Sequence, residues 1–238
     1  MLKVSAIAWL ATALAFSPGH AQESVDLELV LLADASQSID NREIAFQRQG
    51  YAAAITHPQV LSAITSGFDG RIAVTYVEWG SAASQEVVVP WTIIDGAESA
   101  DAFAAALVAP PRMAFGRNAI GAAIEVAQLL IETNGIDGHR KVIDISADSA
   151  NSWNGTPIEI ARAKALSAGI TINGLAVLCR VCSGRPSSYD LEAAFATRII
   201  GGPGSFVVTA DGETSFSEAV RRKLVLEIAQ RAWLSPGG

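Results

Sequence analysis

The sequence predicts an α/β fold in which a parallel β-sheet carries helices on both of its faces. The first observation is that strand-like and helix-like segments alternate from residue 27 to the end of the chain. This alternation predicts parallel strands, because the chain must cross over the sheet between one strand and the next. The second observation is that 50% of the residues are hydrophobic, which supplies a sizeable core and excludes disorder for most of the chain.

The N-terminus has the anatomy of a secretory signal peptide. Lys3 supplies a positive start, residues 5–17 form an apolar run, and small residues favour cleavage after Ala21. The apolar run is shorter than the roughly 20 residues that a membrane-spanning helix needs. We therefore expect residues 1–21 to be removed. The remainder, 22–238, is expected to form a single exported domain, periplasmic or secreted, without stable membrane insertion.

Charge and cysteine usage narrow the function classes. The net charge is −7 and no basic run is present, so nucleic acid and anionic membranes are poor partners for this chain. Cys179 and Cys182 have C-x-x-C spacing in a predicted loop. Export favours a local disulfide between them; free thiols and a catalytic or metal-binding role are the alternatives.

The first predicted strand, residues 27–33 (LELVLLA), is mostly apolar and is expected to be buried. A helix follows from about residue 41. Asp40 caps this helix, and Glu43, three residues later, completes a capping box. The inner face of the helix is expected to carry Ile44, Tyr51 and Ile55.

The next two strands, residues 71–79 and 85–94, are joined by a short loop and predict a hairpin. Pro90 lies in the second of them and cannot donate a backbone hydrogen bond, which places that strand at the edge of the sheet. A helix is expected near residues 99–108.

The second half of the chain continues the alternation. A helix is expected over 119–134 and ends at Gly135, and residues 141–147 form the next strand. The run 156–159 (TPIE) predicts a helix start, capped by its threonine, and this helix ends at Gly169. The remaining elements are a strand at 170–178, a helix at 189–199, a strand at 205–209 and a last helix from Ser215.

The segment Asp34-Ala35-Ser36-Gln37-Ser38 directly follows the first strand. Alternate residues of an extended turn point the same way, so one carboxylate and two hydroxyls converge, a donor set that suits Mg²⁺, Mn²⁺ or Ca²⁺ and not zinc. Asp148 follows another strand, and the carboxyl ends of parallel strands form the ligand crevice of an open sheet. Taken alone, the pentapeptide is equally consistent with a serine-capped helix start.

The order of these features resembles the von Willebrand factor A family over about residues 26–233. The resemblance rests on the strand with Asp34–Ser38, the hairpin, the loop 116–121 (GRNAIG) and the strand ending at Asp148. It is similar in particular to an uncharacterised secreted bacterial subgroup. It implies a doubly wound, mostly parallel six-stranded sheet, Rossmann-like, with helices on both faces.

The resemblance also implies a metal-ion-dependent adhesion site. In it, Ser36 and Ser38 bind the cation directly, while Asp34 and Asp148 bind the cation or its waters. A protein partner supplies an acidic residue as the last ligand. The implied metal residues are Asp34, Ser36, Ser38, Asn118 and Asp148.

Three residues depart from the family pattern. Asn118 stands where threonine is usual, although its amide oxygen remains a ligand for a hard cation. Arg117 brings a positive charge that either points outward or competes with the ion. Ser149 follows Asp148 where glycine is usual.

Asp144 is a carboxylate in the middle of a strand that should be covered on both faces. It is either a hydrogen-bonded structural group or a support behind the metal site. His57 and His139, the histidines that follow the leader, have neither metal nor triad spacing. We therefore expect a binding module and not an enzyme; the alternatives are a metal-free structural domain and a metal-assisted hydrolase using Asp34 and Asp148.

Overall fold

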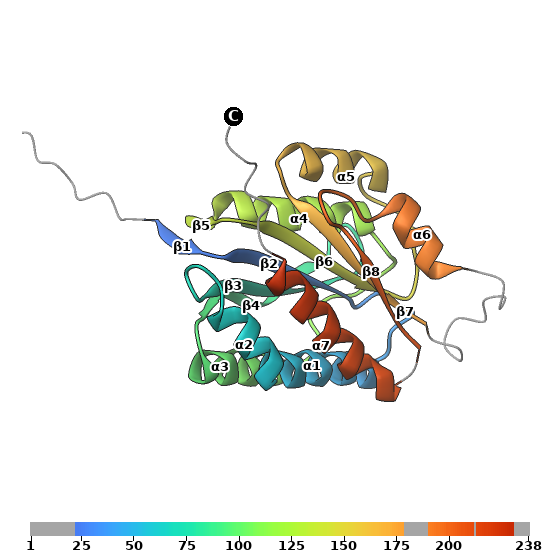
Figure 1. Cartoon of the computed structure of the whole chain (residues 1–238). Helices are drawn as coiled ribbons and strands as arrows, with labels where there is room; N and C mark the ends of the chain where they lie inside the picture. Colours follow the sequence, from blue (N-terminus) through green and yellow to red (C-terminus); the bar gives the residue numbers. More distant parts are fainter. Residues whose placement is uncertain (1–21, 179–189, 212, 231–238) are drawn as a thin grey trace, which may run out of the picture.

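A computed structural model describes residues 22–178, 190–211 and 213–230 (Figure 1). The predicted signal peptide and the pair Cys179 and Cys182 lie outside these residues, as does the side chain of Ser215. The main sheet has six strands in the order β4-β3-β2-β6-β7-β8. The strands are β2 (Leu27–Asp34), β3 (Ile72–Trp79), β4 (Gln85–Ile94), β6 (Lys141–Ala147), β7 (Thr171–Val177) and β8 (Val207–Ala210).

Every pair of neighbouring strands in this sheet is parallel except β3 and β4, which form the predicted antiparallel hairpin. Helices cover both faces (Figure 1). One face carries α1 (Asn41–Ile55), α2 (Pro58–Thr65), α3 (Ala97–Val108) and α7 (Glu213–Ala229). The other carries α4 (Ile120–Thr133), α5 (Ile158–Ser167) and α6 (Leu191–Arg198). The predicted doubly wound α/β architecture is confirmed.

β2 lies at the centre of the sheet and is buried along its whole length. Its side chains alternate between the two cores, because successive residues of a strand point to opposite faces. Leu29 and Leu31 pack toward α1 and α7, whereas Val30 and Leu32 pack toward α4. This two-sided burial explains why residues 29–33 of the strand are all apolar.

β4 is an edge strand, as Pro90 predicts. The pairing of β3 with β4 shifts register on both sides of Tyr76, and the Thr75 hydroxyl donates to the Val89 carbonyl at 2.8 Å. The shift interrupts the ladder of backbone hydrogen bonds at this point, as an extra residue in one strand of an antiparallel pair does.

The capping box of α1 is present: Asp40 accepts hydrogen bonds from the backbone of Arg42 and Glu43, and the Glu43 carboxylate accepts one from the Asp40 N–H. The predicted cap of α5 is wrong. The Thr156 hydroxyl donates instead to the Glu125 carboxylate at 2.5 Å, and no side chain caps the helix start.

Three short elements were not predicted: α2, and a small parallel sheet of β1 (Glu23–Val25) and β5 (Ile136–Gly138). Buried Glu28 fixes the turn before β5, since its carboxylate accepts hydrogen bonds from Asn134 at 2.6 Å and from the Gly138 N–H at 2.9 Å. These contacts join residues more than 100 positions apart.

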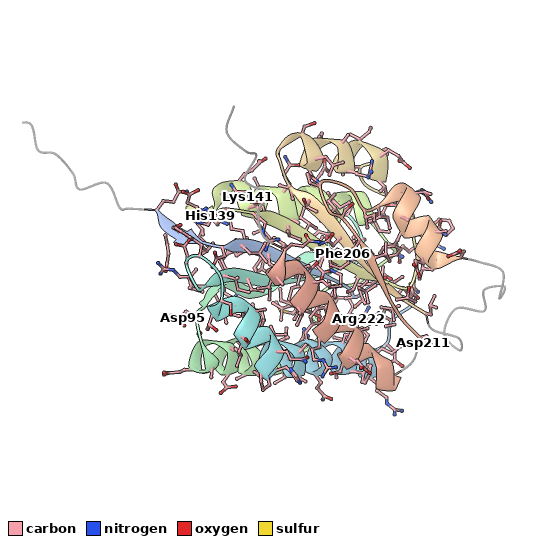
Figure 2. The ribbon with its side chains drawn as sticks, in the orientation of Figure 1. Asp95, His139, Lys141, Phe206, Asp211 and Arg222 are labelled. Atoms are coloured by element: carbon pink, nitrogen blue, oxygen red, sulfur yellow. The ribbon has the colours of Figure 1, made fainter. Side chains whose placement is uncertain are left out.

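The parallel strands place all their carboxyl ends along one edge of the sheet. His139 and Lys141, around the start of β6, lie at one end of the molecule, and Asp211, just after β8, lies at the other (Figure 2). The candidate site is at the Asp211 end, because it follows β2 and β6. In the described ranges, no helix has both the length and the apolar character needed to cross a bilayer.

Candidate functional site

Three loops meet at the carboxyl edge of the sheet. They are the loop after β2 (35–40), the loop before α4 (116–119) and the loop after β6 (148–157). The Gln37 N–H donates to the Gly116 carbonyl, and the Trp153 N–H donates to the Asn118 carbonyl, both at 2.8 Å. The middle loop is therefore tied by its backbone to each of the other two.

Asp34 ends β2 and is buried, with 1% of its surface exposed. Its Oδ1 accepts a hydrogen bond from the Ser36 N–H at 2.7 Å, which folds the loop back over the carboxylate. The hydroxyl oxygens of Ser36 and Ser38 lie 3.1 Å apart. Ser36 is buried and Ser38 is exposed, so the side-chain oxygens of Asp34, Ser36 and Ser38 extend from the interior to the protein surface.

Asp148 directly follows β6, which pairs with β2 so that Ala33 lies opposite Ser146. Asp34 and Asp148 therefore leave neighbouring strands at the same edge, and both are buried. The pKa of Asp34 is raised to about 7, first by burial and then by the negative charge of Asp148. The hydrogen bonds from Ser36 and the charge of Arg112 act in the opposite direction.

These residues fit a hard divalent cation. Asp34 Oδ2 is buried without a hydrogen-bond partner, and no lysine or arginine of the described chain forms an ion pair with Asp34. An ion bound there would satisfy this oxygen and relieve its repulsion from Asp148. Among the described residues, no group of three or more His, Cys, Asp or Glu is placed to hold a metal, so hydroxyl and amide oxygens must complete the donor set.

The three residues that differ from the family pattern have different surroundings in the structure. Asn118 is buried, with 7% of its surface exposed. Arg117 is exposed, and its guanidinium carbon lies 4.9 Å from the centre of the Trp153 ring. Of the two orientations left open for Arg117, the structure shows the outward one. Ser149 is buried and its hydroxyl accepts a hydrogen bond from the Asn151 N–H at 3.2 Å, within the loop.

Arg112 organises the loop after β2, and sequence reasoning missed it. Its guanidinium donates to the carbonyls of Ser36 at 2.9 Å, Ile39 at 2.7 Å and Ala114 at 2.9 Å, and also to that of Ala35. The signal in the sequence was only a lone arginine after two prolines, and its partners are backbone atoms that leave no pattern.

A buried ion pair holds the segment that carries Arg112. Arg48 of α1 and Glu78 of β3 lie 2.6 Å apart and are almost fully buried. Arg48 also donates to the carbonyls of Pro110 and Pro111, and Glu78 accepts from the Met113 N–H at 2.8 Å. The segment is thereby anchored on both sides of Arg112.

Asp144 serves the other side of the sheet. Its carboxylate lies 2.5 Å from the Lys223 ammonium of α7, and both side chains are 1% exposed. Lys223 also pairs with Glu227, to which Asn173 donates at 3.1 Å. Asp144 is therefore a structural carboxylate that joins the sheet to α7.

A family model described as "Protein of unknown function (DUF1194)" matches residues 24–232. A comparison with curated protein sequences finds no match.

Solved structures share the fold. One is proximal thread matrix protein 1 from the mussel byssus with a zinc-occupied MIDAS motif: TM-score 0.61, 17% identity, over 87% of this chain and 49% of that one. Another is the pilus adhesin SpaC from Lactobacillus rhamnosus GG: TM-score 0.60, 12% identity, over 89% of this chain and 31% of that one. A third is the vWF domain of the type V pili tip protein Mfa5 from Porphyromonas gingivalis: TM-score 0.55, 10% identity, over 89% and 98%.

This chain spans about half the length of the mussel protein and less than a third of SpaC. At these identities the likeness is one of fold. The resemblance to the von Willebrand factor A family is confirmed at that level.

Proposed function

The chain belongs to the DUF1194 family, and we propose that it is a binding module that engages a protein partner through a divalent cation. The observation that carries the proposal is the buried carboxylate pair at the carboxyl edge, in which Asp34 Oδ2 has no hydrogen-bond partner among the described residues. The residues that would hold the ion are Asp34, Ser36, Ser38, Asn118 and Asp148.

The donor set favours Mg²⁺ or Mn²⁺, with Ca²⁺ as the alternative, because all its ligands are hard oxygens. The bound ion would offer an open position to an acidic residue of the partner. The mussel protein supports the use of a divalent cation by this fold, since its MIDAS motif is described as occupied by zinc.

Binding fits the rest of the molecule better than catalysis does. His57 caps α2, where its Nδ1 accepts from the Gln59 N–H at 3.2 Å, and His139 lies 2.9 Å from Asp69. Both histidines therefore serve structural contacts away from the three loops. We further propose that the protein acts after export, in the periplasm or outside the cell, which rests on the leader-like sequence of residues 1–21.

Calorimetric titration with Mg²⁺ or Mn²⁺ tests the proposal. The mature protein, stripped with chelator, should bind one ion, and Asp34→Asn should abolish that binding while keeping the shape of the side chain. Asp101→Asn, at an exposed position on α3, is the matched control and should bind as the wild type does. If wild type and Asp34→Asn respond alike to millimolar metal, the chain is a metal-free structural domain.

A further inference from the structure

Arg117 and Trp153 form an exposed pair beside the candidate metal site. Trp153 has 65% of its surface exposed, and the Arg117 guanidinium stacks over its ring at 4.9 Å. Arg117 precedes Asn118 in the chain, and the Trp153 N–H donates to the Asn118 carbonyl. The pair therefore lies on two of the three loops that would hold the ion, 116–119 and 148–157.

The loop that carries Trp153 is fixed on its other side as well. The Asn154 side-chain oxygen accepts a hydrogen bond from the Ala82 N–H at 3.0 Å, in the turn between β3 and β4. The hydrogen bonds at Trp153 N–H and at Asn154 fix the backbone that carries the ring. A large aromatic side chain held in the open by its neighbours is typical of a binding surface, where Trp and Arg carry much of the affinity.

Stacking leaves the guanidinium with hydrogen-bonding capacity to spare. The guanidinium carbon lies over the ring, and a guanidinium that stacks on an aromatic face keeps the N–H donors in its own plane for other acceptors. No described residue accepts a hydrogen bond from Arg117 or forms an ion pair with it. Arg48 and Arg112, by contrast, direct their donors to protein acceptors. Arg117 is thus an exposed cation without an acceptor among the described residues.

The local charge indicates what that acceptor is. With a divalent cation bound, the charges of Asp34 and Asp148 would be balanced, and Arg117 would leave the surface positive. The protein as a whole has a net charge of −7, so this positive surface stands apart from the rest of the chain. A planar carboxylate matches the two parallel N–H groups of a guanidinium edge better than any other side chain does.

We infer that the Arg117–Trp153 pair is a second anchor for the partner, and that the partner presents two acidic side chains close together. One carboxylate binds the cation, which rests on the proposed function, and the other binds the guanidinium edge of Arg117. Because Arg117 and Asn118 are adjacent, the two partner acids are separated by a few residues at most, at about 3.5 Å for each residue of an extended segment.

Synthetic capped peptides test this inference. Each contains two aspartates separated by zero to three glycines, and each has a matched peptide in which one aspartate is asparagine. With Mg²⁺ present, the best two-acid peptide should bind about fivefold more tightly than its one-acid partner, the upper range for an exposed ion pair. Arg117→Ala and Trp153→Ala should remove or reduce that ratio without changing Mg²⁺ affinity measured in the absence of peptide.

Arg222→Ala is the matched control. It removes the same charge from an exposed position on α7 (Figure 2) and should keep the two-acid preference. If Arg117→Ala keeps the preference, or the two kinds of peptide bind equally, the second anchor is wrong while metal-dependent binding stands. If no peptide binds the metal-loaded wild type, both the anchor and the acidic partner of the proposed function are wrong.

Discussion

Asp34 and Asp148 at the carboxyl edge of the sheet can be compared with Asp144 and Glu227, which lie between the sheet and α7. In both places a carboxyl pKa is raised to about 7, first by burial and then by the charge of the second carboxylate. The difference lies in the cation. Lys223 pairs with both Asp144 and Glu227, which we call the inner group. In the edge group, Asp34 and Asp148, no described lysine or arginine forms an ion pair with Asp34.

Each group places two buried carboxylates near each other, and the two groups differ in the cation that balances their charge. In the inner group, Lys223 belongs to the chain and balances the carboxylate charge whenever the protein is folded. Under the proposed function, an ion from solution would balance the charge of the edge group, so that balance would change with the conditions. We expect substitutions in the inner group to alter stability and substitutions in the edge group to alter metal binding.

The largest effect is expected from Lys223→Met. It leaves Asp144 and Glu227 buried without their cation and should lower the free energy of unfolding by about 3–5 kcal/mol. Urea denaturation measures the loss, and adding Asp144→Asn should recover part of it. A loss below about 1 kcal/mol would show that the inner group does not hold α7 to the sheet.

The second effect is a pH dependence of the metal-free protein. Unfolded Asp34 ionises near its ordinary pKa of 3.8, whereas folded Asp34 keeps its proton up to about pH 7. The folded state therefore binds the extra proton, and stability should fall by up to about 1.4 kcal/mol for each pH unit between these values. Asp144 contributes in the same direction, since its pKa is also raised to about 7.

Chemical denaturation between pH 5 and 8, with chelator present, separates the two carboxyls. Asp34→Asn should make the free energy of unfolding depend less on pH. In the wild type, replacing the chelator with saturating Mg²⁺ should have the same effect, because the metal binds the ionised form. An unchanged slope in Asp34→Asn would mean that the edge carboxylate is not the titrating group.

Arg112→Lys probes the scaffold of the edge group. Lysine keeps the charge but cannot reach carbonyls on both sides of the loop, so we expect a loss of about 1–2 kcal/mol in stability and a several-fold lower metal affinity. Arg162→Lys is the control, since Arg162 donates to the Ile200 carbonyl at 2.7 Å, far along the chain from the site. It should leave metal affinity unchanged, and equal effects of both substitutions would contradict the assigned role of Arg112.

The smallest effect concerns Asn118. Asn118→Ala should weaken Mg²⁺ binding by about 1–2 kcal/mol, whereas Asn118→Thr should keep or raise the affinity because it restores a compact hydroxyl. Arg117→Ala tests the charge next to it and should change metal affinity little, since that side chain points to Trp153. Metal binding that is tightened by Arg117→Ala alone would show that the arginine reaches the ion.

The long elements could be predicted because their pattern follows from burial. Residues 141–147 form β6 with the predicted bounds, and Pro90 identified the edge strand. β1 and β5 could not be predicted, since three-residue strands depend on pairing between distant segments and carry no periodicity. Pro58 behind a capping His57 was the available sign of α2. At α5, local spacing predicts the Thr156 hydroxyl as the helix cap, but this hydroxyl donates to Glu125, which is distant in sequence.

For the candidate site, the sequence indicated the positions that follow strands but not the groups that hold them. Asp34 and Asp148 come together because parallel strands end at one edge, a rule that applies before any coordinates are known. The contacts of Arg112, and the stacking of Arg117 on Trp153, depend on how loops far apart in sequence cross. No local pattern encodes such a crossing.

The interrupted pairing at the edge of the sheet has a consequence for how this domain would associate with other chains. A flat exposed strand invites a neighbouring chain to pair with it and to assemble without selectivity. Pro90 removes a donor from β4, the shifted register around Tyr76 interrupts its ladder, and β8 at the opposite edge is only four residues long. Strand addition is thereby discouraged along both edges, so the binding proposed for the loops at the carboxyl edge would not compete with pairing along the sheet.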